Sequence, residues 1–178
     1  AKDETGGLSG PGAVLFGPDG QLYISSFDSD AILRYDGATG AFVDEFVPAK
    51  SGGLDGPDAG MSFGPDGHLY VPGYYSDSIP RFDGETGAPL GDFTQGDKLD
   101  KPRTLVFRGE HLYVANEGSD EVLRYDADSG AFVDVFVAAG AGGLMAPAGM
   151  VFGPDGVLHV ASADNQILRF DADGAPLP

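Results

Sequence analysis

Residues 15–24 read Leu-Phe-Gly-Pro-Asp-Gly-Gln-Leu-Tyr-Ile, and this stretch decides the fold because the chain contains it four times. It returns, with changes, at residues 62–71, 106–114 and 151–160. The copies start 47, 44 and 45 residues apart, counted on the phenylalanine at their second position: Phe16, Phe63, Phe107 and Phe152. Self-similarity at a period of roughly 20–50 residues indicates a repeat architecture.

Each copy contains four stretches that are typical of β-strands. In the first copy these are Val14–Phe16, Leu22–Ser25, Ile32–Tyr35 and Phe42–Val47, and turns of Gly-Pro-Asp-Gly and Asp-Gly-Ala-Thr-Gly separate them. β-Branched and aromatic residues favour strands, whereas Gly, Pro and Asp favour the turns between them. Four strands in about 45 residues are typical of a β-propeller blade. We therefore predict an all-β chain, a single β-propeller domain over residues 1–178 with four four-stranded blades at approximately 7–52, 53–97, 98–142 and 143–178.

The repeated blocks resemble those of a known class of propellers. The pattern Pro-x4-Phe-Gly-Pro-Asp-Gly-x-Leu-Tyr-Val, a polar loop and then Ile-Leu-Arg-Tyr-Asp resembles the NHL-type repeats and their streptogramin lyase-like and SMP-30-like relatives. The likeness extends from about Gly7 to Leu177. It implies the propeller fold, but it does not select a function, because such propellers serve as binding platforms, lyases and lactone hydrolases.

The number of blades leaves three arrangements open, since relatives of this class usually have more than four. The chain is a compact four-bladed ring, half of an eight-bladed ring formed by two copies, or part of a longer array. An open array exposes apolar blade faces and unpaired strand edges, which proteins avoid. We therefore expect a homodimer through the open blade faces or a longer chain.

The charge of the chain restricts its partners. It has 28 acidic and 10 basic residues, with a formal net charge of −18. Such a field repels phosphate backbones and anionic membranes, so we expect no nucleic acid partner. No apolar run approaches the roughly 18 residues of a membrane-spanning helix, so we expect no membrane insertion. Cysteine is absent, and Ala1–Gly10 lack the layout of a secretory signal, so a signal is either missing or already removed. We expect a secreted or extracellular acidic protein.

Candidate binding residues lie where the blades differ from one another. A residue that all four blades share serves the scaffold, and we predict that Arg34, Arg81, Arg124 and Arg169 form ion pairs with the aspartates two positions later. Propeller topology brings the loops between second and third strands, and the connections between blades, to one face. The variable residues there are the predicted binding site: Asp28, Asp58, Tyr74, Tyr75, Arg103, Asn116, Glu117 and Asp164.

Catalytic and metal sites find less support. His68, His111 and His159 are too dispersed to form a metal centre or to serve as a base beside a nucleophile. The resemblance implies histidines and acids at the channel mouth for a lyase or lactonase, but the first strands begin with the inert Ala13, Gly60, Thr104 and Gly149.

We therefore predict no enzyme, no catalytic residues and no cofactor. Calcium stays an option at the aspartate-rich turns 126–130 and 171–174. The expected function is a binding scaffold whose loops contact a protein or glycan partner. The alternatives are a lyase- or lactonase-like enzyme and a structural repeat module of a larger extracellular assembly.

Overall fold

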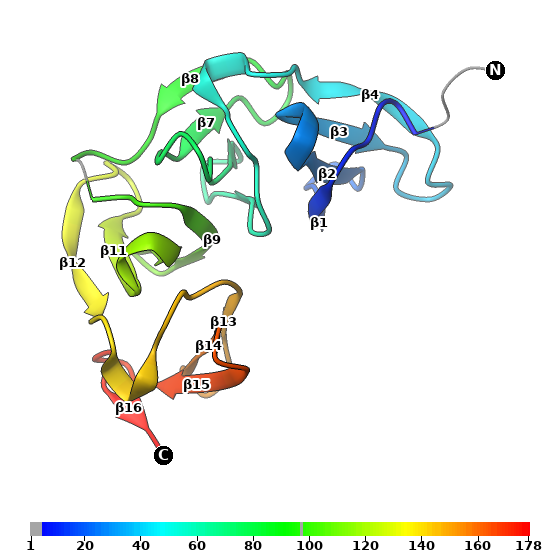
Figure 1. Cartoon of the computed structure of the whole chain (residues 1–178). Helices are drawn as coiled ribbons and strands as arrows, with labels where there is room; N and C mark the ends of the chain where they lie inside the picture. Colours follow the sequence, from blue (N-terminus) through cyan, green and yellow to red (C-terminus); the bar gives the residue numbers. More distant parts are fainter. Residues whose placement is uncertain (1–4, 97) are drawn as a thin grey trace. The chain divides into compact units, whose positions relative to one another are not determined.

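The computed structural model describes residues 5–96 and 98–178. These residues form four four-stranded antiparallel sheets, and in each sheet the strands neighbour one another in chain order (Figure 1). The prediction of an all-β propeller chain with four four-stranded blades is confirmed. In the described part of the chain, no helix is long and apolar enough to cross a bilayer.

The blades follow one another along the sequence. The first contains β1 (Pro11–Phe16), β2 (Leu22–Ser26), β3 (Ala31–Tyr35) and β4 (Phe42–Val47). The second contains β5 (Ser62–Phe63), β6 (Leu69–Tyr70), β7 (Pro80–Phe82) and β8 (Pro89–Asp92). The third contains β9 (Pro102–Arg108), β10 (His111–Asn116), β11 (Glu121–Asp126) and β12 (Phe132–Val137). The fourth contains β13 (Met150–Phe152), β14 (Leu158–Ser162), β15 (Gln166–Phe170) and β16 (Pro176–Leu177). Short 3-10 helices lie in the loops: η1 (Phe27–Ser29), η2 (Ser51–Gly53), η3 (Glu117–Ser119) and η4 (Ala141–Gly143).

The Gly-Pro-Asp-Gly turn closes the first hairpin of the blade through its own backbone. Gly17 N donates to Gln21 O at 2.8 Å, and Gly20 N donates to Gly17 O at 3.0 Å. Gly20 has a φ of +78°, a conformation that favours glycine. A Cβ on Gly37 would overlap the carbonyl oxygen of Gly20, so the two turns of the blade must meet at glycines.

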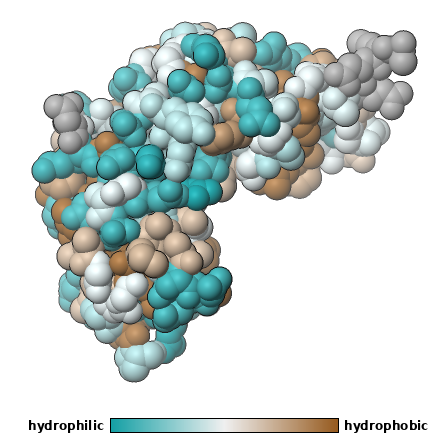
Figure 2. Space-filling model, viewed as in Figure 1, coloured by the Kyte–Doolittle hydropathy of each residue, from teal (hydrophilic) through white to brown (hydrophobic). Residues whose placement is uncertain are grey.

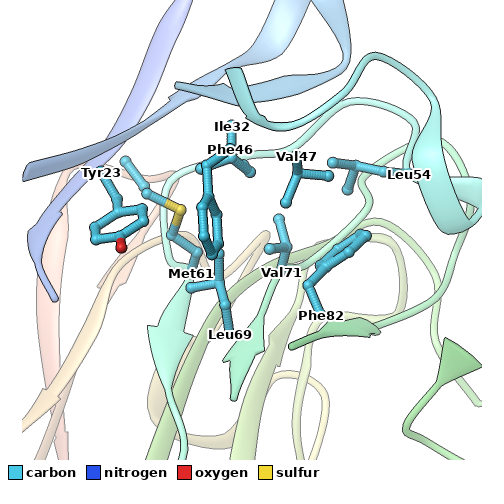
Figure 3. Close-up of a cluster of buried hydrophobic side chains, with 10 residues drawn as sticks. Tyr23, Ile32, Phe46, Val47, Leu54, Met61, Leu69, Val71 and Phe82 are labelled. Atoms are coloured by element: carbon cyan, nitrogen blue, oxygen red, sulfur yellow. The ribbon is translucent and has the colours of Figure 1, made fainter. Parts of the chain in front are cut away.

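The chain divides into two compact units, residues 1–93 and 94–178. We call these the first and second unit; each contains two blades. In the first unit, apolar side chains of both sheets form one core (Figure 3). The Tyr23 ring lies edge-on to Phe46 at 4.9 Å between centroids and to Phe63 at 5.2 Å. The tyrosine of one blade's second strand is thus held between its own fourth strand and the first strand of the next blade.

The second unit repeats this packing. Tyr113 contacts Phe136 and Phe152 edge-on, each at 4.9 Å between centroids. Edge-to-face aromatic pairs contribute about 0.5–1.5 kcal/mol beyond the area that they bury. The repeated phenylalanine and tyrosine positions therefore encode the contact between neighbouring blades within each unit.

Arg34, Arg81 and Arg124 pair with a different aspartate from the one predicted, and Arg169 donates to the carbonyl of Pro178. Arg34 donates to both carboxylate oxygens of Asp44 on the neighbouring strand β4, at 3.0 and 2.5 Å. Asp36, the predicted partner, accepts hydrogen bonds from the backbone N–H and hydroxyl of Thr39 in its own turn. The prediction of partners two positions later is wrong, because the turn already occupies that carboxylate and the strand register brings another one opposite the arginine.

The second blade lacks this pair for a reason visible in its sequence. Gly91 stands opposite Arg81, where the first blade has Asp44 opposite its arginine. The Arg81 guanidinium instead lies 3.8 Å from Asp66. The sheet of this blade is also short, since Pro80 has no N–H to donate to the ladder.

Candidate functional site

Three aromatic rings from two loops of the first unit meet at its surface. Phe27 lies in η1 after β2, and Tyr74 and Tyr75 lie in the loop after β6. The Tyr74 and Tyr75 rings are nearly perpendicular, at 84° with centroids 5.1 Å apart. Phe27 is tilted against both, with its centroid 6.2 Å from Tyr74 and 5.5 Å from Tyr75. We call these three residues the aromatic corner.

Backbone hydrogen bonds hold the corner in place. Tyr74 N donates to Gly56 O at 3.0 Å, and Tyr75 N donates to Asp55 O at 3.2 Å. Gly56 has a φ of +65°, and a Cβ there would lie 2.7 Å from the Tyr75 ring, so the ring rests on bare backbone. The loop is therefore ordered before any ligand arrives, which lowers the entropic cost of binding. Tyr75 is nevertheless 62% exposed.

Two aspartates, Asp28 and Asp30, follow Phe27 in the same loop. Asp28 follows Phe27 directly, is exposed, and accepts the Ser9 hydroxyl at 3.1 Å. Asp30 ends the same 3-10 helix and accepts the backbone N–H of Gly56 at 2.8 Å. The predicted residues Asp28, Tyr74 and Tyr75 thus belong to one surface, and the ring that sequence reasoning left out is Phe27.

The matching loop of the second unit is built differently. The Arg103 guanidinium forms an ion pair with the Glu117 carboxylate at 2.6 Å, so these two predicted residues lie together. Asn116 is fully buried; its amide donates to Lys98 O at 3.2 Å and to Ser119 Oγ at 2.7 Å. Its Oδ1 accepts the Asp100 backbone N–H at 2.8 Å. Asn116 therefore holds the loop in place through buried hydrogen bonds and does not face solvent.

The role of Asn116 could have been found by aligning the blades. Ser26 and Ser162 occupy the same strand position and also bond to the backbone of the connection beside them. Two further predicted residues lie apart from the corner and the ion pair. Asp58 is buried in the first unit, and exposed Gln166 donates to Asp164 in the second at 2.7 Å.

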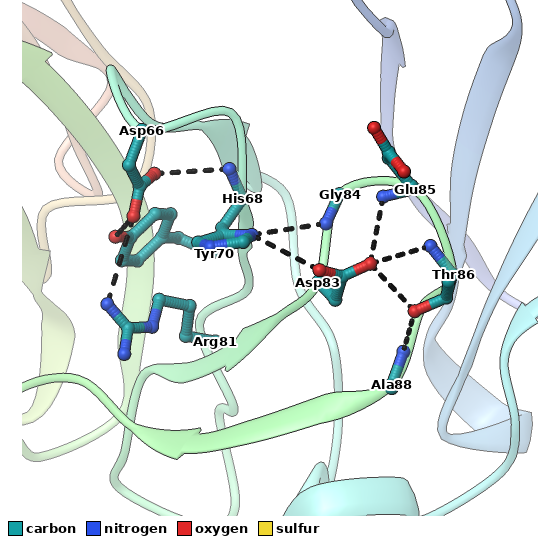
Figure 4. A network of polar contacts seen from close by, with 9 residues as sticks. All are labelled: Asp66, His68, Tyr70, Arg81, Asp83, Gly84, Glu85, Thr86 and Ala88. Atoms are coloured by element: carbon teal, nitrogen blue, oxygen red, sulfur yellow. Dashed lines mark hydrogen bonds and ion pairs between the residues drawn. The ribbon is translucent and has the colours of Figure 1, made fainter.

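A second concave region of the first unit was missed from the sequence. Figure 4 shows the polar contacts of residues along it. The region is a pocket of about 550 Å³, lined by Pro18, Asp19, Asp66, Gly67, His68, Asp83, Gly84 and Glu85. His68 Nδ1 accepts the Gly84 N–H at 3.3 Å and lies 3.9 Å from the Asp83 carboxylate. From the sequence, His68 was considered only as a metal ligand or a base and was assigned no functional role. The signal for the pocket was the set of acids on the two adjoining turns.

Burial and hydrogen bonds shift two pKa values beside this pocket. Burial raises the pKa of Tyr70 to about 12, and the hydrogen bond that its hydroxyl donates to Asp66 at 2.8 Å acts in the same direction. The Thr86 hydroxyl, at 2.7 Å, and the Thr86 backbone N–H lower the pKa of Asp83 below its usual range. The corresponding turn in the first blade shows the same arrangement with Asp36 and Thr39. The network thus belongs to the repeated scaffold.

Metal ligation finds no support in these contacts. Within residues 5–96 and 98–178, no group of three or more His, Asp or Glu side chains could hold a metal ion. In the turn that suggested calcium, Asp126 Oδ1 accepts the Ser129 backbone N–H at 2.8 Å and its hydroxyl at 2.5 Å. This oxygen stabilises the turn.

Comparison with known proteins identifies the fold. No protein family and no curated protein sequence matches the chain. Among solved structures, virginiamycin B lyase from Staphylococcus aureus is similar at 17% identity and a TM-score of 0.72, over 92% of this chain and 53% of that one. A gluconolactonase from Xanthomonas campestris is similar at 23% identity and a TM-score of 0.74, over 94% of this chain and 60% of that one. A streptogramin B lyase is similar at 17% identity and a TM-score of 0.67, over 95% and 54%.

These similarities confirm the resemblance to streptogramin lyase-like and SMP-30-like propellers at the level of the fold. The chain spans between half and two thirds of the length of these structures. They also correct one prediction: the exclusion of an enzyme does not hold, because the similar structures are a gluconolactonase and two lyases. That expectation rested on the dispersed histidines and on the starts of the first strands, whereas binding and catalytic residues lie disproportionately on loops.

Proposed function

We propose that the first unit binds a cationic side chain of a partner protein, with the aromatic corner as the recognition element. The observation that carries this proposal is the geometry of the corner: an exposed tyrosine with a second ring at 84° and a third tilted by 55°. Rings that meet at steep angles form walls around a small group. They offer no single flat platform on which a sugar ring could stack.

Cations are the groups that such walls attract. The face of an aromatic ring carries negative charge density, and a cation within about 6 Å of it gains roughly 0.5–2 kcal/mol. Exposed Asp28 follows Phe27 in the sequence and adds a negative charge to the same loop. The net charge of −18 raises the concentration of cations near the whole surface and so favours the approach of a cationic partner. The rings then select the cationic side chain that binds.

The loops of the second unit provide an internal contrast. Glu117 stands where Phe27 stands in the first unit, and its carboxylate is engaged by Arg103. The other such loop of this unit has Ala163 and Asp164 at its tip and carries no aromatic ring. The proposed specificity therefore belongs to the first unit, where the blades depart from their common pattern.

The strength of binding follows from these contacts. Two ring contacts and one exposed carboxylate together give about 1–5 kcal/mol, which corresponds to a Kd no tighter than about 0.2 mM. A single cationic side chain is thus held weakly. Tight binding of a partner requires further contacts along its surface.

The test uses short peptides that carry one trimethyllysine, and matched peptides with its uncharged tert-butyl isostere. We expect the charged peptide to bind more tightly by about tenfold, as measured by calorimetric or NMR titration. The variant Tyr75→Ala should abolish this difference, whereas the control Leu90→Ala, at another exposed apolar residue of the same unit, should keep it. Equal binding of both peptides, or a difference that survives Tyr75→Ala, would refute the proposal.

A further inference from the structure

The outer surfaces of the first and fourth blades are apolar and exposed. On the first blade, Val14 and Phe16 of β1 are 65% and 64% exposed. On the fourth blade, Val151 of β13 and Ile167 of β15 are 61% and 73% exposed. We call the first pair the leading face and the second pair the trailing face. Hydrophobic residues are visible at the surface over β1 in Figure 2.

Inside the units, the same blade positions form the contacts between neighbouring blades. Met61 occupies the position of Val14 and is only 6% exposed, because it packs against the first blade. Ile32 occupies the position of Ile167 and is fully buried against the second blade. The leading and trailing faces are therefore the two halves of an interblade contact.

The two faces have complementary shapes. The trailing face contains a hollow of about 410 Å³, lined by Gly149, Met150, Val151, His159, Ala161 and Ile167. Phe63, at the position of Phe16, fills the corresponding surface of the first blade by packing edge-on to Tyr23. In the fourth blade, His159 stands at the position of Tyr23. A Phe16 side chain would thus enter the hollow beside His159.

A segment before β1 prepares the leading face for a preceding blade. Thr5-Gly6-Gly7-Leu8 repeats the connection Ser51-Gly52-Gly53-Leu54, which joins the first blade to the second. Leu8 N donates to Thr5 O at 3.3 Å, as Leu54 N donates to Ser51 O at 3.1 Å. Leu54 is buried under the preceding blade, whereas Leu8 is only partly buried, against residues of its own blade. The segment has the form of an interblade connection and lacks the cover that such a connection receives.

We propose that the trailing face of one copy of this chain docks on the leading face of a second copy, and that the reciprocal contact closes a pair. Both halves of the contact are present in one chain, so two copies satisfy all four exposed faces through two equivalent head-to-tail interfaces. The chain spans 53% and 54% of the two lyase propellers that it resembles, so two copies together match about the length of one such propeller.

Charge predicts how salt affects this pair. Each copy has a net charge of −18, so two copies repel each other while their apolar faces attract. Salt screens the repulsion and leaves the apolar contact intact. The pair should therefore become tighter as salt is raised, whereas a pair held by ion pairs would weaken.

The test measures mass against concentration by sedimentation equilibrium. We expect the mass to rise from 18.3 kDa to twice that value. Val14→Asp and Ile167→Asp should each raise the dissociation constant by about a hundredfold, since each buries an unpaired charge. The control Val43→Asp changes an exposed valine on β4 outside either face and should leave it unchanged. Circular dichroism checks that each variant is folded.

Mixing the two variants tests the head-to-tail arrangement itself. A Val14→Asp copy keeps its trailing face, and an Ile167→Asp copy keeps its leading face. The mixture should therefore recover one intact interface and form a heterodimer that neither variant forms alone. Four results would each overturn the proposal. The parent chain could stay a folded monomer at all concentrations or form an open series of larger species. Only one of the two substitutions could weaken pairing, or the mixture of variants could stay monomeric.

Discussion

The buried hydroxyl of Tyr125 provides a test of the packing in the second unit. The side chain is fully buried on β11, and its hydroxyl has no hydrogen-bond partner among the described residues. At the same blade position, Tyr35 donates its hydroxyl to the Thr5 carbonyl at 2.7 Å, and Phe82 and Phe170 have no hydroxyl at all. The substitution Tyr125→Phe therefore removes a polar group that the fold does not use.

The expected gain follows from two opposing terms. A buried, unpartnered hydroxyl costs about 1–3 kcal/mol of desolvation, which the substitution recovers. The void left by the lost oxygen costs up to about 1 kcal/mol, because tightly packed surroundings relax only in part. The net result is a stabilisation of about 1 kcal/mol, or a rise in Tm of about 3 °C.

The assay compares the urea unfolding of the variant with that of the matched control Tyr35→Phe. The control removes a hydroxyl that has a partner, so it should lose about 0.5–1.5 kcal/mol. Burial also raises the pKa of Tyr125 to about 12. The parent chain should thus lose stability as the pH rises from 10.0 to 12, and Tyr125→Phe should reduce that loss. A Tyr125→Phe variant that is less stable than the parent at pH 7 would refute the reasoning, because it would mean that the hydroxyl has a partner in solution.

Three other results follow from the repeated contacts. Gly87→Ala should destabilise the chain by at least about 3 kcal/mol more than Gly40→Ala. Both glycines have φ near +70°, but only at Gly87 would a Cβ overlap a carbonyl oxygen of the preceding blade. Thermal unfolding measures the difference, and equal losses of stability would contradict the prediction. Burial raises the pKa of Tyr70 to about 12, so its neutral form stabilises the fold below pH 10.0 and this contribution disappears by pH 12. The free energy of unfolding of Tyr70→Phe should therefore fall less than that of the parent chain between pH 10.0 and pH 12. The Thr86 hydroxyl lowers the pKa of Asp83 in the folded chain. The ionised carboxylate therefore stabilises the fold above pH 3.8, and this stabilisation is lost as the pH falls through the lowered pKa. NMR titration of the carboxyl group should find a midpoint below 3.8, and an ordinary midpoint would rule out the hydrogen bond.

The strands were predictable because their signals are local. Phe42–Val47 was predicted as a strand and forms β4 with the same bounds. Alternating β-branched and aromatic residues between glycine-rich turns define such segments without knowledge of their neighbours. In the second blade the predicted strand pattern was similar, but β6 covers only Leu69–Tyr70. The prolines at 72 and 80 interrupt the hydrogen-bond ladder there. The prediction followed the similarity between the repeats and did not take these prolines into account.

The partners of side chains were less predictable, because strand register decides them. The contact between Arg34 and Asp44 depends on how β3 lies against β4, and a bulge shifts that register. The aromatic corner shows the same difficulty. Tyr74 and Tyr75 stood out in the sequence, but Phe27 is 47 positions earlier than Tyr74, and only the packing of two blades brings the rings together.

Comparison of equivalent positions in the blades shows that the exposed blade faces and the aromatic corner have different causes. Val14 and Met61 are both apolar and differ in exposure, so the difference reflects the neighbour that is present, and the position itself serves contact between blades. Phe27 and Glu117 hold the same loop position and differ in chemistry, so the difference lies in the sequence, and under the proposed function it sets what the first unit binds. It follows that the two proposals are independent. Tyr75→Ala alters the loop surface without changing either blade face, and Val14→Asp alters a blade face without touching the aromatic corner, so failure of one leaves the other standing.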